Sequence, residues 1–138
     1  MKLPSWLINR THAVSYRLVS EGFAAADSHG YHYRLLAALA EFGPSSQAAL
    51  GRSTGVDRSD VVAALNELAD RGLVKRSPDA SDRRRNTVSI TAAGRRRLTA
   101  LDQVLAGVQD KLLSPLSAAE RQQLVSLLSR VLAHHAAD

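Results

Sequence analysis

The chain has 138 residues, a net charge of +5 and a hydrophobic fraction of 45%, which together suit one globular domain with one main core. It contains no cysteine, which excludes disulfides and thiolate zinc sites and favours a reducing, cytoplasmic compartment. No apolar run is long enough to cross a membrane, and the first residues make a poor signal peptide. The excess of positive charge favours an anionic partner such as nucleic acid.

Apolar residues recur at the spacing of an α-helix through the first half of the chain. The pattern predicts four helices, over residues 4–26, 31–43, 45–55 and 57–72. The first is long for so small a chain, at roughly 33 Å for a rise of about 1.5 Å per residue. The last two are joined by a few residues that include Gly55, which is the arrangement of a helix-turn-helix.

A β-hairpin is predicted to follow. Residues 73–76 and 87–90 are typical of strands, and the turn-rich run between them forms a long tip. Residues 71–97 contain nine basic and two acidic side chains, a local charge of +7 that exceeds the net charge of the whole chain. The basic character of the protein is therefore concentrated around this hairpin.

Two further long helices are predicted to end the chain. Thr91 can cap the fifth helix, and a capping box from Ser117 to Glu120 opens the sixth. Their apolar residues step by three and four, as in the seam between packed long helices. Because the terminal helices carry more apolar surface than the small middle of the chain can cover, we expect them to pack against a second copy in a homodimer.

The order of these elements predicts a mostly α (α+β) fold, a winged helix-turn-helix with long N- and C-terminal dimerisation helices. The expected parts are an N-terminal dimerisation helix over residues 1–28, a DNA-binding lobe over residues 29–94 and C-terminal dimerisation helices over residues 95–138.

The predicted helix-turn-helix supplies candidate contacts to DNA. Its second helix would enter the major groove, with Val61, Leu65 and Leu68 turned to the core. The outward residues that could then reach bases or phosphates are Arg58, Ser59, Val62, Ala63 and Asn66. Ser46 and Gln47, at the start of the preceding helix, are placed to hold a phosphate.

The hairpin tip supplies a second set of contacts. A wing beside a major-groove helix lies over the adjacent minor groove, where arginine is favoured. We therefore expect contacts from Arg83, Arg84 and Arg85, and interpret Asp82 as a brace that fixes the tip. The alternative is a solvated loop that only aids solubility.

The motifs "DRSDVV", "LADRGLVKR" and "DRRRNTVSIT", with Thr91 and Gly94 as "T-x-x-G", resemble the winged helix-turn-helix core of the MarR family of bacterial regulators. The resemblance covers roughly residues 31–94. It implies a homodimer on a pseudo-palindromic operator in double-stranded DNA, with Asp82 and Arg84 as the wing signature and Arg84 in the minor groove. Where many members have Ser or Thr, this chain has Asp60, to which we give a helix-end role.

The resemblance also implies a repressor that is released by a small, often aromatic or anionic ligand bound between the dimer helices and the DNA-binding lobe. Polar aromatic and basic residues of the first two helices could form that pocket, namely His12, Tyr16, Arg17, Tyr31, His32 and Tyr33. The alternative is that these side chains pack at a helix junction with their polar tips satisfied.

Other classes of function have less support. We expect no metal site, because the five histidines have no acid or third histidine at local spacing, and no other cofactor. The chain has no glycine-rich phosphate loop, nucleophile motif or suggestive pair of acids, so we expect no enzyme. A non-specific architectural DNA-binding protein is the remaining alternative, since it would use the same charge without reading sequence.

Overall fold

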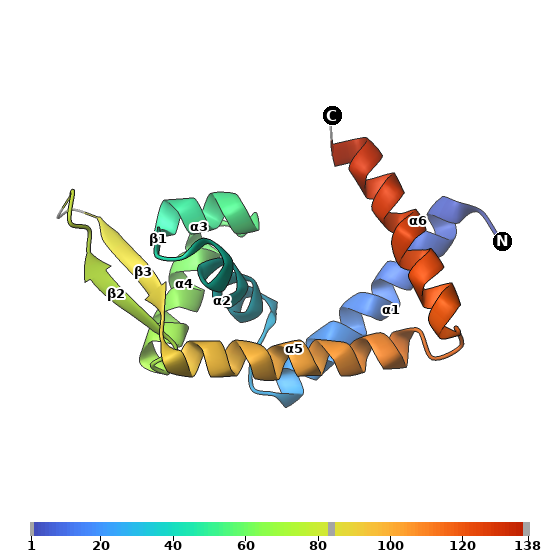
Figure 1. The fold of residues 1–138 in the computed structure, drawn as a ribbon, viewed down its shortest axis with the longest axis horizontal. Helices are drawn as coiled ribbons and strands as arrows, with labels where there is room; N and C mark the ends of the chain where they lie inside the picture. Colours follow the sequence, from blue (N-terminus) through green and yellow to red (C-terminus); the bar gives the residue numbers. More distant parts are fainter. Residues whose placement is uncertain (1, 83–84, 137–138) are drawn as a thin grey trace.

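The computed structural model describes residues 2–82 and 85–136. In chain order its elements are α1 (Pro4–Ala25), α2 (Gly30–Phe42), β1 (Ser45–Ser46), α3 (Gln47–Thr54), α4 (Arg58–Asp70), β2 (Val74–Pro78), β3 (Asn86–Ile90), α5 (Ala92–Leu112) and α6 (Ala118–Ala136). The long α5 runs across the molecule (Figure 1). At one end of it lies a compact lobe made of α2, α3, α4 and the strands, and at the other lie α6 and the start of α1.

The predicted fold class is confirmed, with one strand that the sequence did not reveal. The addition is β1, in which Ser45 and Ser46 pair with Val88 and Thr87 of β3. The three strands form an antiparallel sheet in the order β1-β3-β2. Two consecutive serines carry no alternation of polar and apolar residues, so periodicity could not identify this strand.

Capping contacts within the sequence fix the helix-turn-helix. The hydroxyl of Ser46 accepts a hydrogen bond from the backbone N–H of Ala49 at 3.1 Å and so caps α3. Gly55 ends α3 with a φ of 71°, a left-handed conformation that costs glycine little. Asp57 caps α4 by accepting from the backbone N–H of Ser59 at 3.3 Å. The start of α4 is therefore set by local chemistry.

The lobe packs around an apolar core to which α5 contributes Leu101. Its most deeply buried leucines and valines are Leu35, Leu36, Leu39, Leu50, Val61, Leu65, Leu68, Val88 and Leu101. The predicted stripe of Val61, Leu65 and Leu68 is confirmed as the buried face of α4. Because burial of each such side chain stabilises the fold by about 1.5–3 kcal/mol, this core holds α4 firmly against the lobe.

Thr91 and Gly94 join the hairpin to α5. The Thr91 hydroxyl donates to the carbonyl of Gly72 at 2.7 Å and accepts from the backbone N–H of Gly94 at 3.0 Å. A Cβ at position 94 would collide with the carbonyl oxygen of Leu73. The "T-x-x-G" motif therefore fixes the point at which α5 leaves the lobe.

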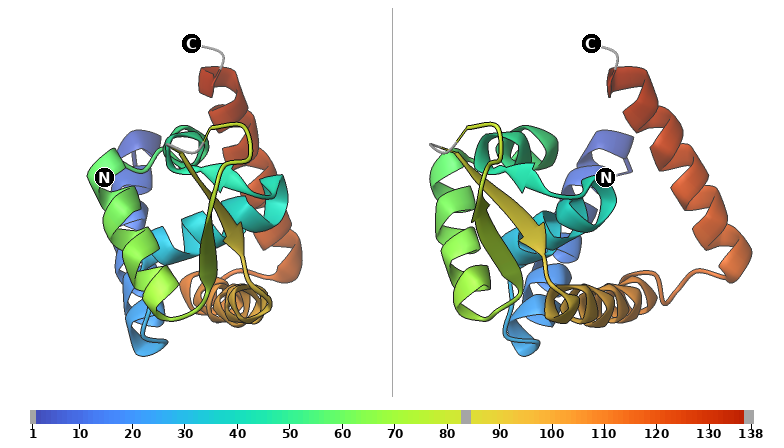
Figure 2. Two further views of the ribbon diagram at one scale, coloured as in Figure 1. Left: turned by 90° about the vertical axis from the view of Figure 1, so that its left-hand side faces the viewer. Right: turned by 60° about the vertical axis from the view of Figure 1, so that its left-hand side comes forward.

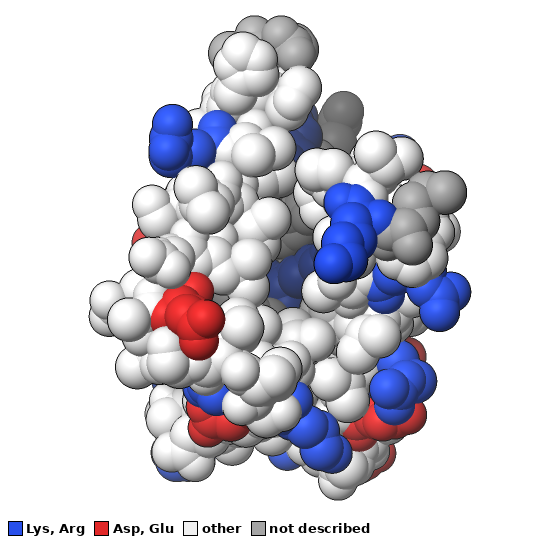
Figure 3. Space-filling view, turned by 90° about the vertical axis from the view of Figure 1, so that its right-hand side faces the viewer, with Lys and Arg blue, Asp and Glu red and all other residues white. Residues whose placement is uncertain are grey.

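The terminal helices leave apolar surface uncovered. No residue of α6 is buried, and its large exposed apolar side chains are Val125, Leu127, Leu128, Val131 and Leu132. The N-terminal segment adds Leu3, Trp6, Leu7, Ile8 and Val14. Figure 2 shows α6 standing away from the lobe, and most of the face that it forms is uncharged (Figure 3). Even so, none of the described helices has the length and hydropathy needed to cross a membrane.

Candidate nucleic-acid interface

One face of α4 is free of the core and carries the predicted base contacts. Arg58, Ser59, Val62, Ala63 and Asn66 are all exposed, as the helical spacing predicts. Asp60, which departs from the family pattern, lies half-buried in the first turn of α4. A negative charge is stabilised there by the positive end of the helix dipole. The side chains of Val62 and Ala63 on this face are small enough for α4 to approach the edges of bases closely.

Ser59 is held by the residue that caps its helix. Its hydroxyl donates to Oδ2 of Asp57 at 2.7 Å, and these hydrogen bonds lower the pKa of Asp57. A hydroxyl has one proton and two lone pairs, so Ser59 meets an external group as an acceptor while this bond lasts. The complementary groups in the major groove are the amino groups of adenine and cytosine.

Asn66 is oriented by the hairpin. Arg76 of β2 donates from Nη2 to Oδ1 of Asn66 at 2.8 Å, which leaves the amide nitrogen of Asn66 as the group to face a ligand. Arg76 was not among the predicted site residues. The available signal was a second basic residue, after Lys75, at the end of the first predicted strand, but the hydrogen bond itself depends on how the strand packs against α4.

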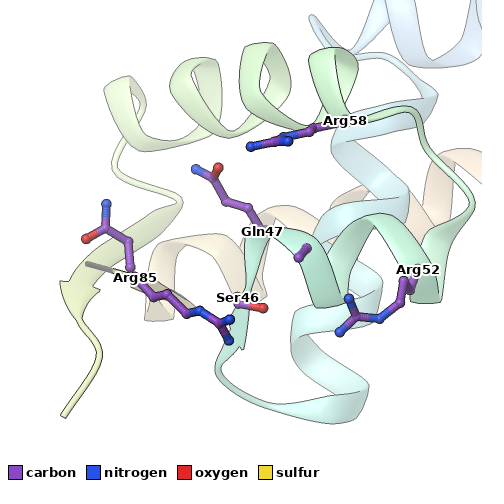
Figure 4. A pocket seen from close by; sticks show the side chains of 7 residues that line it. Ser46, Gln47, Arg52, Arg58 and Arg85 are labelled. Atoms are coloured by element: carbon purple, nitrogen blue, oxygen red, sulfur yellow. The ribbon is translucent and has the colours of Figure 1, made fainter. Parts of the chain in front are cut away.

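A basic hollow of about 360 Å³ lies between α3, the start of α4 and the wing. Among the described residues, its lining consists of Ser46, Gln47, Ala48, Arg52, Arg58, Arg85 and Asn86, which include three arginines and no acid. Figure 4 shows the side chains of Arg58, Arg85 and Arg52 reaching it from three sides, with Gln47 in its centre. This arrangement suits an anion such as a backbone phosphate.

The hollow brings together residues that the sequence placed in separate motifs. Ser46 and Gln47 were predicted at the start of α3, Arg58 on α4 and Arg85 on the wing, and all four line it. Arg52, which stands in the last turn of α3, was not among the predicted site residues. Its only signal was a basic residue at a helix end, which is common on any protein surface.

The wing tip is closed by hydrogen bonds from Asp79 as well as by Asp82. The backbone N–H of Asp79 donates to the carbonyl of Arg85 at 2.8 Å, and its Oδ1 accepts from the N–H and the hydroxyl of Ser81, each at 2.9 Å. The two hydrogen bonds from Ser81 lower the pKa of the Asp79 carboxyl. Asp82 lies with Oδ2 3.8 Å from Nε of Arg85. Arg83 and Arg84 lie outside the described residues.

The candidate ligand residues fall into two sets. On α1, the rings of His12 and Tyr16 lie with centroids 6.3 Å apart, and Arg17 pairs with Glu21 at 3.5 Å. The other set, Tyr31, His32 and Tyr33, occupies the first turn of α2.

Tyr33 is tied into the packing between helices. Its ring stacks on Phe23 of α1 at 5.6 Å between centroids, and its hydroxyl donates to Oδ1 of Asp102 on α5 at 2.7 Å. The Asp102 carboxylate, aided by burial, raises the pKa of Tyr33 to about 12. These contacts match the alternative interpretation of a polar tip satisfied at a helix junction, and the pocket stays a prediction.

His32 is the buried polar side chain of the same turn. It is 2% exposed, its Nε2 lies 2.7 Å from Oε2 of Glu67 on α4, and its Nδ1 lies 3.2 Å from the hydroxyl of Ser28. Nε2 of His29 lies 3.2 Å from the same oxygen of Glu67. Burial lowers the pKa of His32, and the hydrogen bonds with His32 and His29 lower that of Glu67. Local spacing did not reveal this acid, because Glu67 lies 35 residues after His32.

The helix pair α3–α4, the following hairpin and the basic hollow between them define the winged helix-turn-helix class of proteins. Residues 28–85 match the family model described as MarR family. The chain belongs to the MarR family.

Two relatives support this assignment in sequence. The chain is 35% identical over 97 residues to the HTH-type transcriptional repressor NicR of Pseudomonas putida. The matched residues make up 70% of this chain and 61% of that protein. It is 34% identical over 99 residues to the putative transcriptional regulatory protein for hcr operon of Thauera aromatica. Here the matched residues make up 72% of this chain and 60% of that protein. The chain thus spans about three fifths of the length of each relative.

A solved structure supports the assignment over the whole length. The PcaV transcriptional regulator of Streptomyces coelicolor is 26% identical, with a TM-score of 0.78 over 99% of this chain and 100% of that one. The terminal helices therefore match as well as the winged lobe.

Proposed function

We propose that this chain is a homodimeric, sequence-specific DNA-binding regulator of transcription, of the repressor type, that is released from its operator by a small molecule. The observation that carries the proposal is the continuity of the basic hollow with the exposed face of α4. A hollow lined by arginines would hold the phosphate backbone, and the adjoining helix face would then meet base edges.

The proposed docking follows from where these groups lie. The tip of the wing, α3 and the start of α4 gather at one end of the lobe (Figure 2). With α4 in the major groove, Ser46, Gln47 and Arg52 would grip a phosphate while Val62, Ala63 and Asn66 approach bases. Arg83, Arg84 and Arg85 would enter the neighbouring minor groove, with Asp82 as their brace.

A second copy of the chain completes the proposed assembly. The exposed apolar side chains of α1 and α6 would be covered in a two-fold dimer. Residues 1–28 and 95–138 would then form the dimerisation part and residues 29–94 the DNA-binding lobe. Two lobes related by a two-fold axis would read a pseudo-palindromic operator on double-stranded DNA.

Release by a ligand is proposed from the relatives. PcaV has been solved in complex with its natural ligand, in a structure 28% identical to this chain with a TM-score of 0.73. In this chain the ligand would be small and anionic or aromatic, held by Arg17, His12 and Tyr16 together with the first turn of α2. The proposed regulator acts in the cytoplasm, where the operator DNA lies, and has no catalytic role.

A footprint tests the proposal. The dimer is incubated with the DNA upstream of its own gene, and protection from nuclease is mapped with and without phenolic and carboxylate metabolites. We expect a protected pseudo-palindrome that one of these compounds clears. Uniform protection along the fragment would instead favour the alternative, a non-specific architectural DNA-binding protein.

A further inference from the structure

We propose that His29, His32 and Glu67 form a binding site for a first-row transition-metal ion of the Zn²⁺, Co²⁺ or Ni²⁺ type. One ligand atom of each residue lies within 4.8 Å of the other two. Two ligand atoms bound to one such ion are separated by roughly 3 Å at bond lengths of about 2.0–2.1 Å. The distances of 3.2 and 2.7 Å from the two Nε2 atoms to Oε2 of Glu67 are close to that separation.

The direction of the two imidazoles supports a shared ion. Both present Nε2 to the same carboxylate oxygen, and their ring centroids are 3.8 Å apart. A carboxylate can accept hydrogen bonds from both histidines, but two imidazole nitrogens and a carboxylate oxygen gathered at one place are also the set of ligand atoms that a cation requires. Two imidazoles and one carboxylate suit zinc, cobalt or nickel better than magnesium or calcium, which prefer oxygen ligands alone.

Ser28 is placed to orient the buried ligand. Its hydroxyl lies 3.2 Å from Nδ1 of His32, so an Nδ1–H donated to it would leave the lone pair of Nε2 for the metal. A hydrogen bond to the far nitrogen is the usual support of a metal-bound histidine. The neighbouring cation Arg71 donates to the carbonyl of Asp27 at 2.6 Å and pairs with its carboxylate at 3.7 Å, which directs its charge toward the end of α1.

Access to the site is one-sided. The side chain of His32 is 2% exposed, while those of His29 and Glu67 are 44% and 51% exposed. An ion could therefore enter from solvent and become anchored on a buried nitrogen. Three protein ligands leave at least one position for water or an external donor.

Glu67 makes the site relevant to DNA. It follows Asn66 on α4, while His29 and His32 stand at the start of α2. A bound ion would fix α4 against α2 and would favour the arrangement of α4 seen here, so we expect metal to tighten operator binding. This consequence rests on the proposed function, whereas metal binding itself does not.

Cobalt(II) chloride is the probe, because its visible absorption reports the ligands directly and Zn²⁺ has no such signal. Tag-free protein carrying His134→Ala and His135→Ala serves as background, because these neighbouring histidines, with ring centroids 4.9 Å apart, could bind metal themselves. Into it are introduced His29→Ala with Glu67→Gln, the two exposed ligands. Circular dichroism establishes that each variant is folded.

We expect the background protein to bind about one ion per chain at micromolar concentration or tighter, and Zn²⁺ to displace the cobalt. The double ligand variant should bind at least about 100-fold more weakly, since loss of an outer-shell partner alone costs 10–100-fold. Ser28→Ala should weaken binding by about tenfold. No uptake at millimolar cobalt, or equal uptake by the ligand variant, would overturn the site.

A separate titration tests the regulatory consequence. Operator affinity is measured with zinc chloride and with a chelator, for the background protein and the ligand variant. A rise in affinity with zinc that the ligand variant lacks supports the coupling. Metal binding without such a rise would overturn the coupling alone, and the absence of any operator binding would count against the proposed function instead.

Discussion

The lobe and the terminal helices differ in where their apolar side chains lie. In the lobe, α4 buries Val61, Leu65 and Leu68 within its own chain and exposes a polar face. In contrast, α6 is a longer helix with no buried residue, and it displays its apolar side chains to solvent. The lobe is therefore stabilised within one copy, while the terminal helices would bury their apolar surface in the proposed dimer.

The largest expected effect comes from the core of the lobe. Leu65→Ala would remove a side chain that is 0% exposed and should destabilise the protein by about 2–5 kcal/mol. Leu132→Ala, at 71% exposed in one chain, is the matched change on α6. Urea denaturation at several protein concentrations measures both. If the loss from Leu65→Ala disappeared at high concentration, the lobe would not be stabilised within one copy.

A charge on α6 tests the other half of the comparison. Leu128→Asp would place an unpaired carboxylate in the proposed dimer interface and should weaken dimerisation by at least about 2 kcal/mol. Sedimentation equilibrium measures the change. Ser129→Asp adds the same charge at the next, exposed position and should have a smaller effect. Unchanged dimers of Leu128→Asp would place the interface elsewhere.

The basic hollow predicts a smaller effect that is confined to DNA. Arg58→Ala should weaken operator binding by about 1–3 kcal/mol if Arg58 meets a base, or lower the salt slope by about one unit if it meets a phosphate. Lys111→Ala, a loss of charge at the far end of α5 (Figure 1), is the control. Fluorescence anisotropy across salt concentrations separates the two outcomes. Equal losses of operator affinity in both variants would mean that Arg58 contributes only through the net charge of the protein.

The smallest effect is expected at the joint between the two regions. Tyr33→Phe removes the hydrogen bond to Asp102 and should cost about 1 kcal/mol at neutral pH. Because folding raises the pKa of Tyr33 from 10.0 to about 12, this contribution is complete below pH 10 and is lost as the pH rises through about 12. In a titration followed by phenolate absorption, the protein should show a tyrosine that ionises near pH 12 and that Tyr33→Phe lacks. An ionisation near pH 12 that persists in Tyr33→Phe would contradict its assignment to Tyr33.

The parts of the fold that follow from local patterns were predictable. The stripe on α4, the caps at Ser46 and Asp57 and the Thr91–Gly94 motif each depend on residues a few positions apart, where periodicity and capping chemistry operate. The outward face of α4 follows from the same spacing. The lining of the basic hollow was predicted in part because three of its elements carry recognisable motifs.

The remaining contacts depend on tertiary packing. Glu67 meets His32 across 35 positions and Asp102 meets Tyr33 across 69, and no local spacing links such pairs. Arg76 and Asn66 lie 10 positions apart, yet they meet only because β2 turns back along α4. For the same reason, local spacing offered no acid for His29 and His32 as metal ligands, although the fold places Glu67 beside both.

In the proposed complex, the exposed face of α4 reads the base sequence while the basic hollow holds the DNA backbone. The most direct measurement is selection of bound duplexes from a random library, followed by the affinity ratio between the selected site and its scrambled form at physiological salt. We expect a pseudo-palindromic site that is preferred over its scrambled form by about 10³ or more. A dimer that binds the selected and scrambled duplexes equally would contradict it.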